Sequence, residues 1–358
     1  MITTPTPPPA PFRSLFVRAG DGLRLHARVY GQAPDAHPPV VCLPGLTRNA
    51  HDFHDLALAL STLEGRPRRV IALDYRGRGL SAHDPDWRRY SIEVESGDVL
   101  AVLAAAGVAE AIFVGTSRGG LITMALAATR PTLIAGAVLV DVGPVVQAKG
   151  LIRIRSALAK MPRPKGWEEA IEALRRLNDA QFPALDEAGW RKLAEGIFRE
   201  PGEGDKGSGL VPTYDPALVK TLEVLDLEQE PPALWPLFEA LAHVPVLVVR
   251  GALSDVLSRE TLTAMLARHP RIAAHEVPGQ GHAPLLDGET AARIVAFIDA
   301  AEAGDDRDPS APPAAAEAAG EIRGEARREA PAQTPPQTPQ EPRLPKAGSH
   351  PGFPPRPA

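Results

Sequence analysis

Runs of apolar residues recur along the chain, and most of them are too continuous to leave a polar face. Such runs predict strands that are buried on both sides, as in a parallel sheet covered by helices. They are Val40–Leu43, Val70–Leu73, Ala111–Val114, Ala137–Val140, Val246–Val249 and Ile272–Val277. Before them, Leu15–Ala19 and Leu23–Tyr30 alternate apolar and polar residues around Asp21-Gly22, which predicts an antiparallel hairpin.

Segments with apolar residues at helical spacing lie between these runs. They are Phe53–Leu60, Glu93–Ala106, Leu121–Thr129, Thr261–Ala267 and Thr290–Ala301. Because strands and helices alternate, the pattern predicts an α/β protein with a mostly parallel sheet. Residues 146–232 break the alternation, since they hold the amphipathic segments Trp167–Leu177 and Leu185–Phe198 and no convincing strand. We expect this interval to form an inserted helical cap over the carboxyl ends of the strands, where open α/β sheets bind ligands.

A Gly-x-Ser-x-Gly sequence stands between one of these strands and the helix that follows it. The strand pattern stops at Gly115, Ser117 is the central serine, and helical spacing begins directly afterwards. A sharp turn of this kind strains its central residue and needs small neighbours, so that the adjacent chain can pass close by. The turn holds the serine hydroxyl out of the sheet, and the amide of Arg118 lies at the helix start, where it can meet a developing negative charge. We therefore predict that Ser117 is a nucleophile.

Composition excludes several other kinds of protein. A hydrophobic content of 44% and a charged content of 23% are typical of a soluble globular protein. The net charge of −5 and the absence of a basic block argue against a nucleic-acid partner, and no run is long enough to span a membrane. The single cysteine, Cys42, excludes an internal disulfide framework and is expected to be a buried thiol. The first residues lack the pattern of a signal peptide, so we expect a cytoplasmic location.

The prolines divide the chain further, because many of the 39 gather near its end. Residues 305–358 contain hardly any large apolar residue, and such a composition cannot offset the entropy of ordering. We expect a flexible N-terminus over residues 1–11, an α/β core over residues 12–145 and 233–301, the cap over residues 146–232, and a disordered Pro/Ala-rich tail over residues 302–358. Prolines at every third position from Pro336 to Pro345 suit a weak protein-docking segment, and a plain solvated tail is the simpler interpretation.

A serine hydroxyl attacks only if a base takes its proton, and the base needs a carboxylate beside it. After a turn of this kind the chain order is serine, acid, histidine. His282, in Gly281-His282 beyond the last strand, is the predicted base, and Asp255, directly after a strand, is the favoured acid. Asp141 also follows a strand and stays open as the alternative acid. The amides of Leu46 and Arg118 are the expected oxyanion donors.

Taken together, these pieces resemble the α/β-hydrolase superfamily over roughly residues 12–301. The matching segments are Leu43-Pro44-Gly45-Leu46, Asp74 to Ser81, Gly115 to Gly120, Gly251 to Asp255 and Gly281-His282. The resemblance implies a sheet of about eight strands, a cap, and hydrolysis of esters or related acyl bonds without a cofactor. Many members carry His-Gly where this chain has Pro44-Gly45, and many have an uncharged residue where it has Arg118. We expect Arg118 to pair with an internal carboxylate rather than with a substrate.

The leading interpretation is a serine hydrolase that cleaves a carboxylic ester, or a similar acyl bond, of a small molecule through an acyl-enzyme intermediate. A lactone or carbon–carbon-bond hydrolase would use the same three side chains. A ligand-binding or interaction protein on this fold is the alternative from another class. No metal-ligand spacing is present, and we expect neither a metal nor a cofactor.

Overall fold

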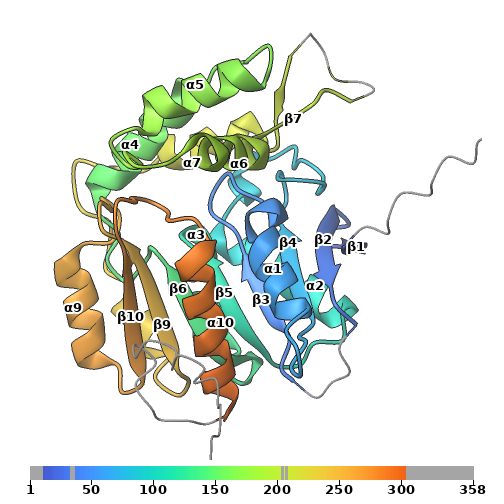
Figure 1. Ribbon diagram of the computed structural model, residues 1–358, viewed down its shortest axis with the longest axis vertical. Helices are drawn as coiled ribbons and strands as arrows, with labels where there is room; N and C mark the ends of the chain where they lie inside the picture. Colours follow the sequence, from blue (N-terminus) through green and yellow to red (C-terminus); the bar gives the residue numbers. More distant parts are fainter. Residues whose placement is uncertain (1–10, 33–36, 203–204, 206–208, 304–358) are drawn as a thin grey trace, which may run out of the picture. The chain divides into compact units, whose positions relative to one another are not determined.

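A mostly parallel sheet organises the computed structural model, which describes residues 11–32, 37–202, 205 and 209–303. In this part of the chain the sheet has eight strands in the order β1-β2-β4-β3-β5-β6-β9-β10 (Figure 1). β2 runs antiparallel to β1 and β4, and every other neighbouring pair is parallel. The strands are β1 Arg13–Arg18, β2 Arg24–Tyr30, β3 Val40–Leu43, β4 Val70–Asp74, β5 Ala111–Thr116, β6 Ile134–Val140, β9 Val246–Gly251 and β10 Ile272–Val277. The predicted hairpin and the predicted parallel sheet are both confirmed.

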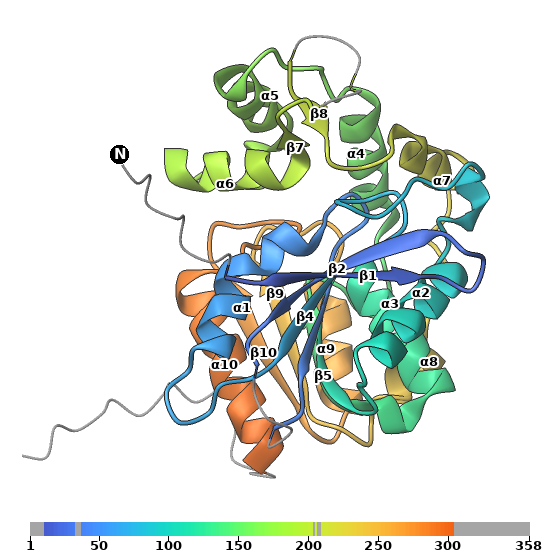
Figure 2. The ribbon, with the colours of Figure 1, turned by 90° about the vertical axis from the view of Figure 1, so that its right-hand side faces the viewer.

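The central strands are apolar throughout because helices cover both of their faces (Figure 2). In β3, Val41 and Leu43 join the buried cluster on one face, whereas Val40 and Cys42 join the cluster on the other. The first cluster includes residues of α2 (Ile92–Ala105), α3 (Arg118–Thr129), α8 (Trp235–Glu239) and α9 (Arg259–Arg268), and the second those of α1 (His54–Ser61) and α10 (Gly288–Ala303). Cys42 is a free, buried thiol, as expected, and burial raises its pKa.

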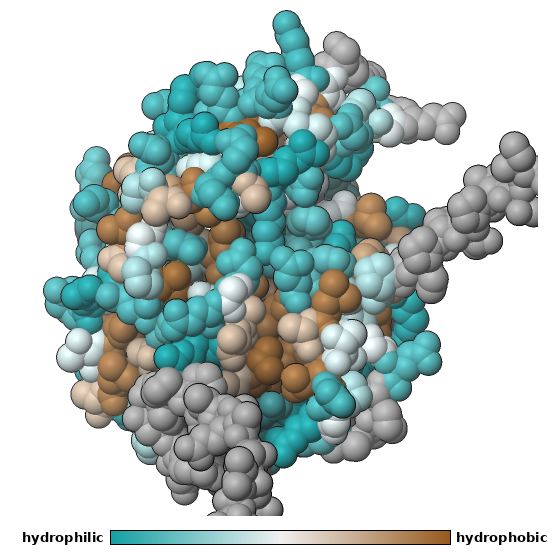
Figure 3. All heavy atoms as spheres, in the orientation of Figure 1, coloured by the Kyte–Doolittle hydropathy of each residue, from teal (hydrophilic) through white to brown (hydrophobic). Residues whose placement is uncertain are grey.

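Residues 146–232, which we call the cap segment, are mainly helical, as the sequence predicts. Its helices are α4 (Ala148–Ala159), α5 (Trp167–Asn178), α6 (Glu187–Ile197) and α7 (Lys220–Glu223). The amphipathic segments correspond to α5 and α6, whereas α4, α7 and the two-residue strands β7 (Phe198–Arg199) and β8 (Val211–Pro212) were not predicted. Leu174 of α5 and Trp190 of α6 meet in a separate buried cluster. The charged residues of α5 are exposed. In Figure 3, which has the orientation of Figure 1, the surface at the top of the molecule is accordingly mostly hydrophilic.

The described residues cover only part of the segments that we expected to be flexible at the two ends of the chain. Helix α10 continues to Ala303, so the first two residues of the expected tail, 302 and 303, are helical. The rest of that tail and residues 1–10 of the expected flexible N-terminus lie outside the described residues. The division into core and cap at residues 146 and 232 stays a prediction. None of the helices in the described ranges is both long and apolar enough to cross a membrane.

A buried carboxylate at the end of β4 holds the loop that follows this strand. Asp74 Oδ1 accepts from the amide of Ala50 at 2.8 Å, and Oδ2 accepts from the amide of Leu80 at 2.9 Å. Oδ2 also lies 2.7 Å from His26 Nδ1. Gly79 takes φ +56°, and a Cβ atom there would come within 2.2 Å of the Asp74 carboxylate. The loop after Asp74 is thus held against the carboxylate, which explains Gly79, whereas a Cβ atom on Gly77 would come within 2.7 Å of Tyr90.

Replacing Asp74 by alanine would leave the buried amide of Ala50 and the partly buried amide of Leu80 without their acceptor. Each unpaired buried group costs about 1–3 kcal/mol, so we expect Asp74→Ala to lower the free energy of unfolding by about 2–5 kcal/mol in urea denaturation. Glu110→Ala, at an exposed position, is the control and should change it by less than about 0.5 kcal/mol. Equal effects of the two substitutions would contradict this role of Asp74.

Candidate active site

Ser117 occupies the tight turn between β5 and α3. Its backbone has φ 51° and ψ −110°, which is a strained conformation for a residue with a Cβ atom. The Ser117 amide donates to the carbonyl of Val140 at 2.8 Å, and the Ser117 carbonyl accepts from the amide of Gly120 at 2.9 Å. These bonds tie the turn to the end of β6 and to the first turn of α3. The strain is therefore maintained by the surrounding backbone.

The glycines around Ser117 are required by contact distance. A Cβ atom on Gly119 would lie 2.0 Å from the carbonyl oxygen of Leu43, and one on Gly115 would lie 2.5 Å from the carbonyl carbon of Gly119. Real Cβ atoms do not approach backbone atoms so closely. Helix α3 can therefore pack against the end of β3 only if these positions lack a side chain. The close approach that the sequence predicts is present.

His282 bridges Ser117 and a buried carboxylate. Its Nε2 lies 2.9 Å from Ser117 Oγ, and its Nδ1 lies 2.8 Å from Asp141 Oδ2. Because a carboxylate only accepts hydrogen bonds, the proton of the neutral ring belongs on Nδ1, and Nε2 is left to accept from the serine hydroxyl. The amide of His282 donates to Gln181 Oε1 of the cap segment at 2.9 Å. The loop that carries the imidazole is thus fixed from both sides.

The carboxylate beside His282 is Asp141, not the favoured Asp255. β6 lies between β9 and β5, the strand that Ser117 directly follows. A residue at the carboxyl end of β6 therefore lies between the loops that hold the other groups. Asp141 directly follows β6 and is fully buried, with φ 54°. Oδ1 accepts from the Gly251 amide at 2.8 Å, and Oδ2 accepts from Ser254 Oγ at 2.6 Å. The loop after β9 therefore supplies a hydroxyl, not a carboxylate, to this group.

Asp255 faces the cap segment instead. Its two carboxylate oxygens accept from Arg153 Nε at 2.6 Å and Arg153 Nη2 at 2.8 Å. Burial acts to raise the pKa of Asp255, but the bonds and the charge of Arg153 outweigh burial, and this pKa lies below its ordinary value. Helix α4 also approaches at Gly150, where a Cβ atom would lie 2.6 Å from the Asp255 carbonyl oxygen. The geometry makes Asp255 a partner of α4 and corrects the contact expected from the sequence.

A cavity of about 710 Å³ opens onto Ser117 and His282. Leu46 and Arg118, the expected oxyanion donors, line the same cavity, and a Cβ atom on Gly45 would lie 3.9 Å from Ser117 Cβ. Their role in binding an oxyanion stays a prediction. The other walls are mostly apolar and include Leu151, Ile154, Leu158, Leu222 and Leu225 of the cap segment.

The cations that line this cavity in the described residues all have acidic partners. Arg118 pairs with Glu95, the internal carboxylate that the sequence analysis expected in general terms. Arg48 pairs with Asp52, Arg153 with Asp255, and Lys192 with Asp55 and Asp287. No group of three or more His, Cys, Asp or Glu side chains in the described ranges is arranged to hold a metal ion.

Sequence reasoning missed three side chains that bind the predicted residues: Ser254 binds Asp141, Gln181 binds His282, and Arg153 binds Asp255. Ser254 could have been suspected because it precedes Asp255 in the same turn. Gln181 and Arg153 lie in the cap segment, 101 and 102 residues before their partners along the chain. No local sequence pattern indicates that they contact the site.

Known proteins are similar to this chain over most of their length. Residues 38–188 match the family described as alpha/beta hydrolase fold. The 3-hydroxybutyrate-oligomer hydrolase of Cupriavidus necator is 36% identical over 276 residues, which are 75% of this chain and 91% of the relative. An esterase of Mycobacterium tuberculosis is 28% identical over 254 residues, 70% of this chain and 78% of the esterase.

A solved structure agrees with these relatives. The crystal structure of an alpha/beta hydrolase from Novosphingobium aromaticivorans is similar with a TM-score of 0.74 and 38% identity, covering 81% of this chain and 99% of that one. The chain therefore belongs to the α/β-hydrolase family, as a hydrolase with an eight-stranded, mostly parallel sheet. The resemblance stated from the sequence motifs is confirmed.

The pair between Arg153 and Asp255 should depend on pH. The folded pKa of Asp255 is depressed, so its stabilising contribution is complete above the unfolded value of about 4 and is lost as the pH falls through the folded value. We expect a double-mutant cycle of Arg153→Gln and Asp255→Asn to give a coupling of about 1–3 kcal/mol at pH 7. In urea denaturation this coupling should shrink steadily below about pH 4. A coupling that is the same at pH 7 and pH 3 would contradict this interpretation.

Proposed function

We propose that this protein is a serine hydrolase that cleaves a carboxylic ester of a small molecule through an acyl-enzyme intermediate. The observation that carries the proposal is the continuous chain of contacts from Ser117 Oγ through His282 to Asp141, 2.9 Å and 2.8 Å long, at the wall of a cavity. Nucleophile, base and buried acid in this order are the arrangement that acyl transfer requires. In this proposal Asp141, not Asp255, is the acid.

The expected reaction begins when Ser117 Oγ attacks the ester carbonyl carbon and its proton passes to His282 Nε2. Asp141 stabilises the imidazolium through the Nδ1 proton. The carbonyl oxygen becomes an oxyanion that accepts hydrogen bonds from the amides of Leu46 and Arg118. Collapse of this intermediate breaks the ester bond, and the leaving alcohol takes the proton from Nε2. A water molecule then attacks the acyl-enzyme by the same steps and releases the acid.

The cavity supports an apolar, uncharged substrate. Its volume of about 710 Å³ lies within the usual range of about 300–1,000 Å³ for small-molecule pockets, and its walls are mainly apolar, with leucine the most frequent residue. The cations at its wall already have carboxylate partners, so that none of them offers an unpaired charge to a substrate. The relative from Cupriavidus necator is named for hydrolysis of 3-hydroxybutyrate oligomers. We therefore place short oligoesters of hydroxy acids beside simple alkyl esters as the substrates to be tried first.

Ser117→Ala should abolish ester hydrolysis, because the nucleophile is removed while the fold is kept. We expect kcat/KM for a chromogenic short-chain ester to fall by at least about 1000-fold, with an unchanged circular dichroism spectrum and Tm. The same comparison should be repeated with 3-hydroxybutyrate dimers and trimers, with acid release followed by titration. Equal, slow turnover by wild type and variant would favour a ligand-binding protein, and turnover confined to cyclic esters would favour a lactonase.

Asp141→Asn and Asp255→Asn form a matched pair for the acid. An amide at position 141 would favour the wrong tautomer of His282, and we expect kcat to fall by roughly 10³- to 10⁴-fold. Asp255→Asn, which breaks only the contact with Arg153, should change kcat by less than about 10-fold. Steady-state kinetics on the best ester decides between them, and a larger loss for Asp255→Asn would reverse the assignment.

A further inference from the structure

A buried chain of charged side chains joins the two segments that are expected to supply the oxyanion donors. The carbonyl of Leu46 accepts from Arg78 Nε at 2.7 Å. Arg78 Nη1 donates to Glu95 Oε1 at 2.6 Å, and the other oxygen of Glu95 accepts from Arg118 Nε. Arg78 and Glu95 are both 0% exposed. One carboxylate therefore links the turn after β3 to the first residue of α3.

Both ends of this chain are held by further contacts. Arg118 Nη2 donates to the carbonyl of Tyr90 at 2.8 Å, and Arg78 Nη1 donates to the carbonyl of Arg76 at 2.7 Å. The Arg78 guanidinium also lies over the rings of Tyr75 and Tyr90, 5.5 and 5.4 Å from their centroids. Arg78 thus anchors the carbonyl of Leu46 in the turn after β3, where Pro44 has no amide proton to donate.

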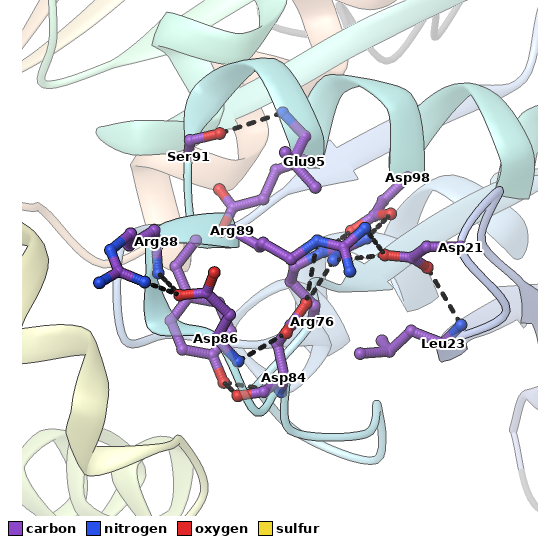
Figure 4. A network of polar contacts seen from close by, with 12 residues as sticks. Asp21, Leu23, Arg76, Asp84, Asp86, Arg88, Arg89, Ser91, Glu95 and Asp98 are labelled. Atoms are coloured by element: carbon purple, nitrogen blue, oxygen red, sulfur yellow. Dashed lines mark hydrogen bonds and ion pairs between the residues drawn. The ribbon is translucent and has the colours of Figure 1, made fainter.

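A second buried arginine in the same loop provides a comparison. Arg76 binds Asp98 through two bonds of 2.6 Å, and it also binds Asp84 and Asp21, as Figure 4 shows. Burial opposes its charge, but Asp98 and Asp21 outweigh burial and raise the pKa of Arg76. Glu95 and Asp98 lie three positions apart on α2, and Figure 4 shows both on this helix. The Arg76 cluster holds the hairpin turn and the loop at Asp84, because the side-chain partners of Arg76 in the described structure are Asp21, Asp84 and Asp98.

The chain through Glu95 is less well compensated. Burial lowers the pKa of Arg78, and the single carboxylate of Glu95, which is shared with Arg118, does not fully offset it. In the described structure Arg78 Nη2 is buried without a hydrogen-bond partner. A buried ion pair seldom stabilises a fold more than apolar residues of the same volume would, and an unsatisfied donor adds a further cost. The arrangement is therefore poorly explained by stability alone.

We propose that Glu95 is a positioning residue that sets the separation of the Leu46 and Arg118 amides through Arg78 and Arg118. The inference depends on the proposed function, because these amides matter only if an oxyanion forms between them. An oxyanion hole works through donors fixed before the reaction, and a misplacement of about 1 Å can cost about 100-fold in rate. Glu95 acts on the transition state and not on the resting ester, so its removal should lower kcat and leave KM nearly unchanged.

The test compares Glu95→Gln with Asp98→Asn, since each removes one buried negative charge from α2. We expect Glu95→Gln to lower kcat by about 10- to 100-fold, with KM within about threefold. Asp98→Asn should lower Tm by a similar amount and keep kcat within about twofold below its Tm. Similar kcat losses in the two variants, or wild-type kcat in a folded Glu95→Gln, would overturn the proposal.

The inhibition constant of a trifluoromethyl ketone is a second measurement. It would not change if Glu95 only stabilised the fold. Ser117 Oγ adds to the ketone carbon, its proton passes to His282, and the ketone oxygen becomes an oxyanion in the proposed hole. The inhibition constant should rise in Glu95→Gln by about the factor lost in kcat/KM and stay unchanged in Asp98→Asn. An inhibition constant that does not change in Glu95→Gln would count against positioning.

Arg118→Met keeps the amide and removes only the side-chain link, and it carries the test if Glu95→Gln does not fold. Its kcat should fall by at least about 10-fold, and wild-type kcat in the folded variant would overturn the proposal. Ser117→Ala is measured beside these variants. Wild-type turnover equal to that of Ser117→Ala would reject the hydrolase itself, whereas a clear Ser117 effect without a Glu95 effect would reject the positioning role alone.

Discussion

The candidate site depends on the contact between the start of α3 and the end of β3. Gly119 lies so close to the Leu43 carbonyl that a Cβ atom would overlap it, and this closeness brings the turn with Leu46 beside Ser117. The strained backbone of Ser117 is a consequence of the same packing, because the chain must reverse from strand to helix within one residue. Steric exclusion thus determines where Ser117 lies relative to the turn with Leu46. The polar contacts of the site form within that arrangement.

The loops at the carboxyl ends of the strands supply the other residues of the candidate site. The loop after β6 provides Asp141, and the loop after β10 provides His282. Asp141 is held by the amide of Gly251, the last residue of β9, and by Ser254 in the loop after that strand. A fully buried carboxylate needs all of its hydrogen-bond partners, and Asp141 receives three. Asp255 is thereby free to bind Arg153, so that the core holds the cap segment beside the site.

Helix α2 shows how one element can serve two purposes. Asp98 satisfies Arg76 in a cluster of three carboxylates that closes surface loops over the sheet. Glu95, one turn earlier, serves Arg78 and Arg118 at once and reaches the segments beside Ser117. Arg76 and Arg78 are separated only by Gly77, yet they bind different acids. Gly77 has φ +72° and turns the chain between them. Local spacing alone would have made them look equivalent.

Much of this could be foreseen from the sequence, because the features in question are local. Continuous apolar runs identified the strands, helical spacing identified α5 and α6, and Gly-x-Ser-x-Gly between a strand and a helix identified the turn at Ser117. His282 could be selected because the chain order after such a turn is restricted. Helix α4 was missed because its apolar side chains line a cavity and its pattern has no single buried core face.

The choice between Asp141 and Asp255 could not be made in the same way. Each aspartate follows a strand by a few residues, and the sequence contains the distances along the chain but not the order of strands across the sheet. The sequence determined which residue types must meet and at which edge of the sheet. Only the tertiary structure decided which carboxylate faces the imidazole and which faces Arg153, because those contacts join residues more than 100 positions apart.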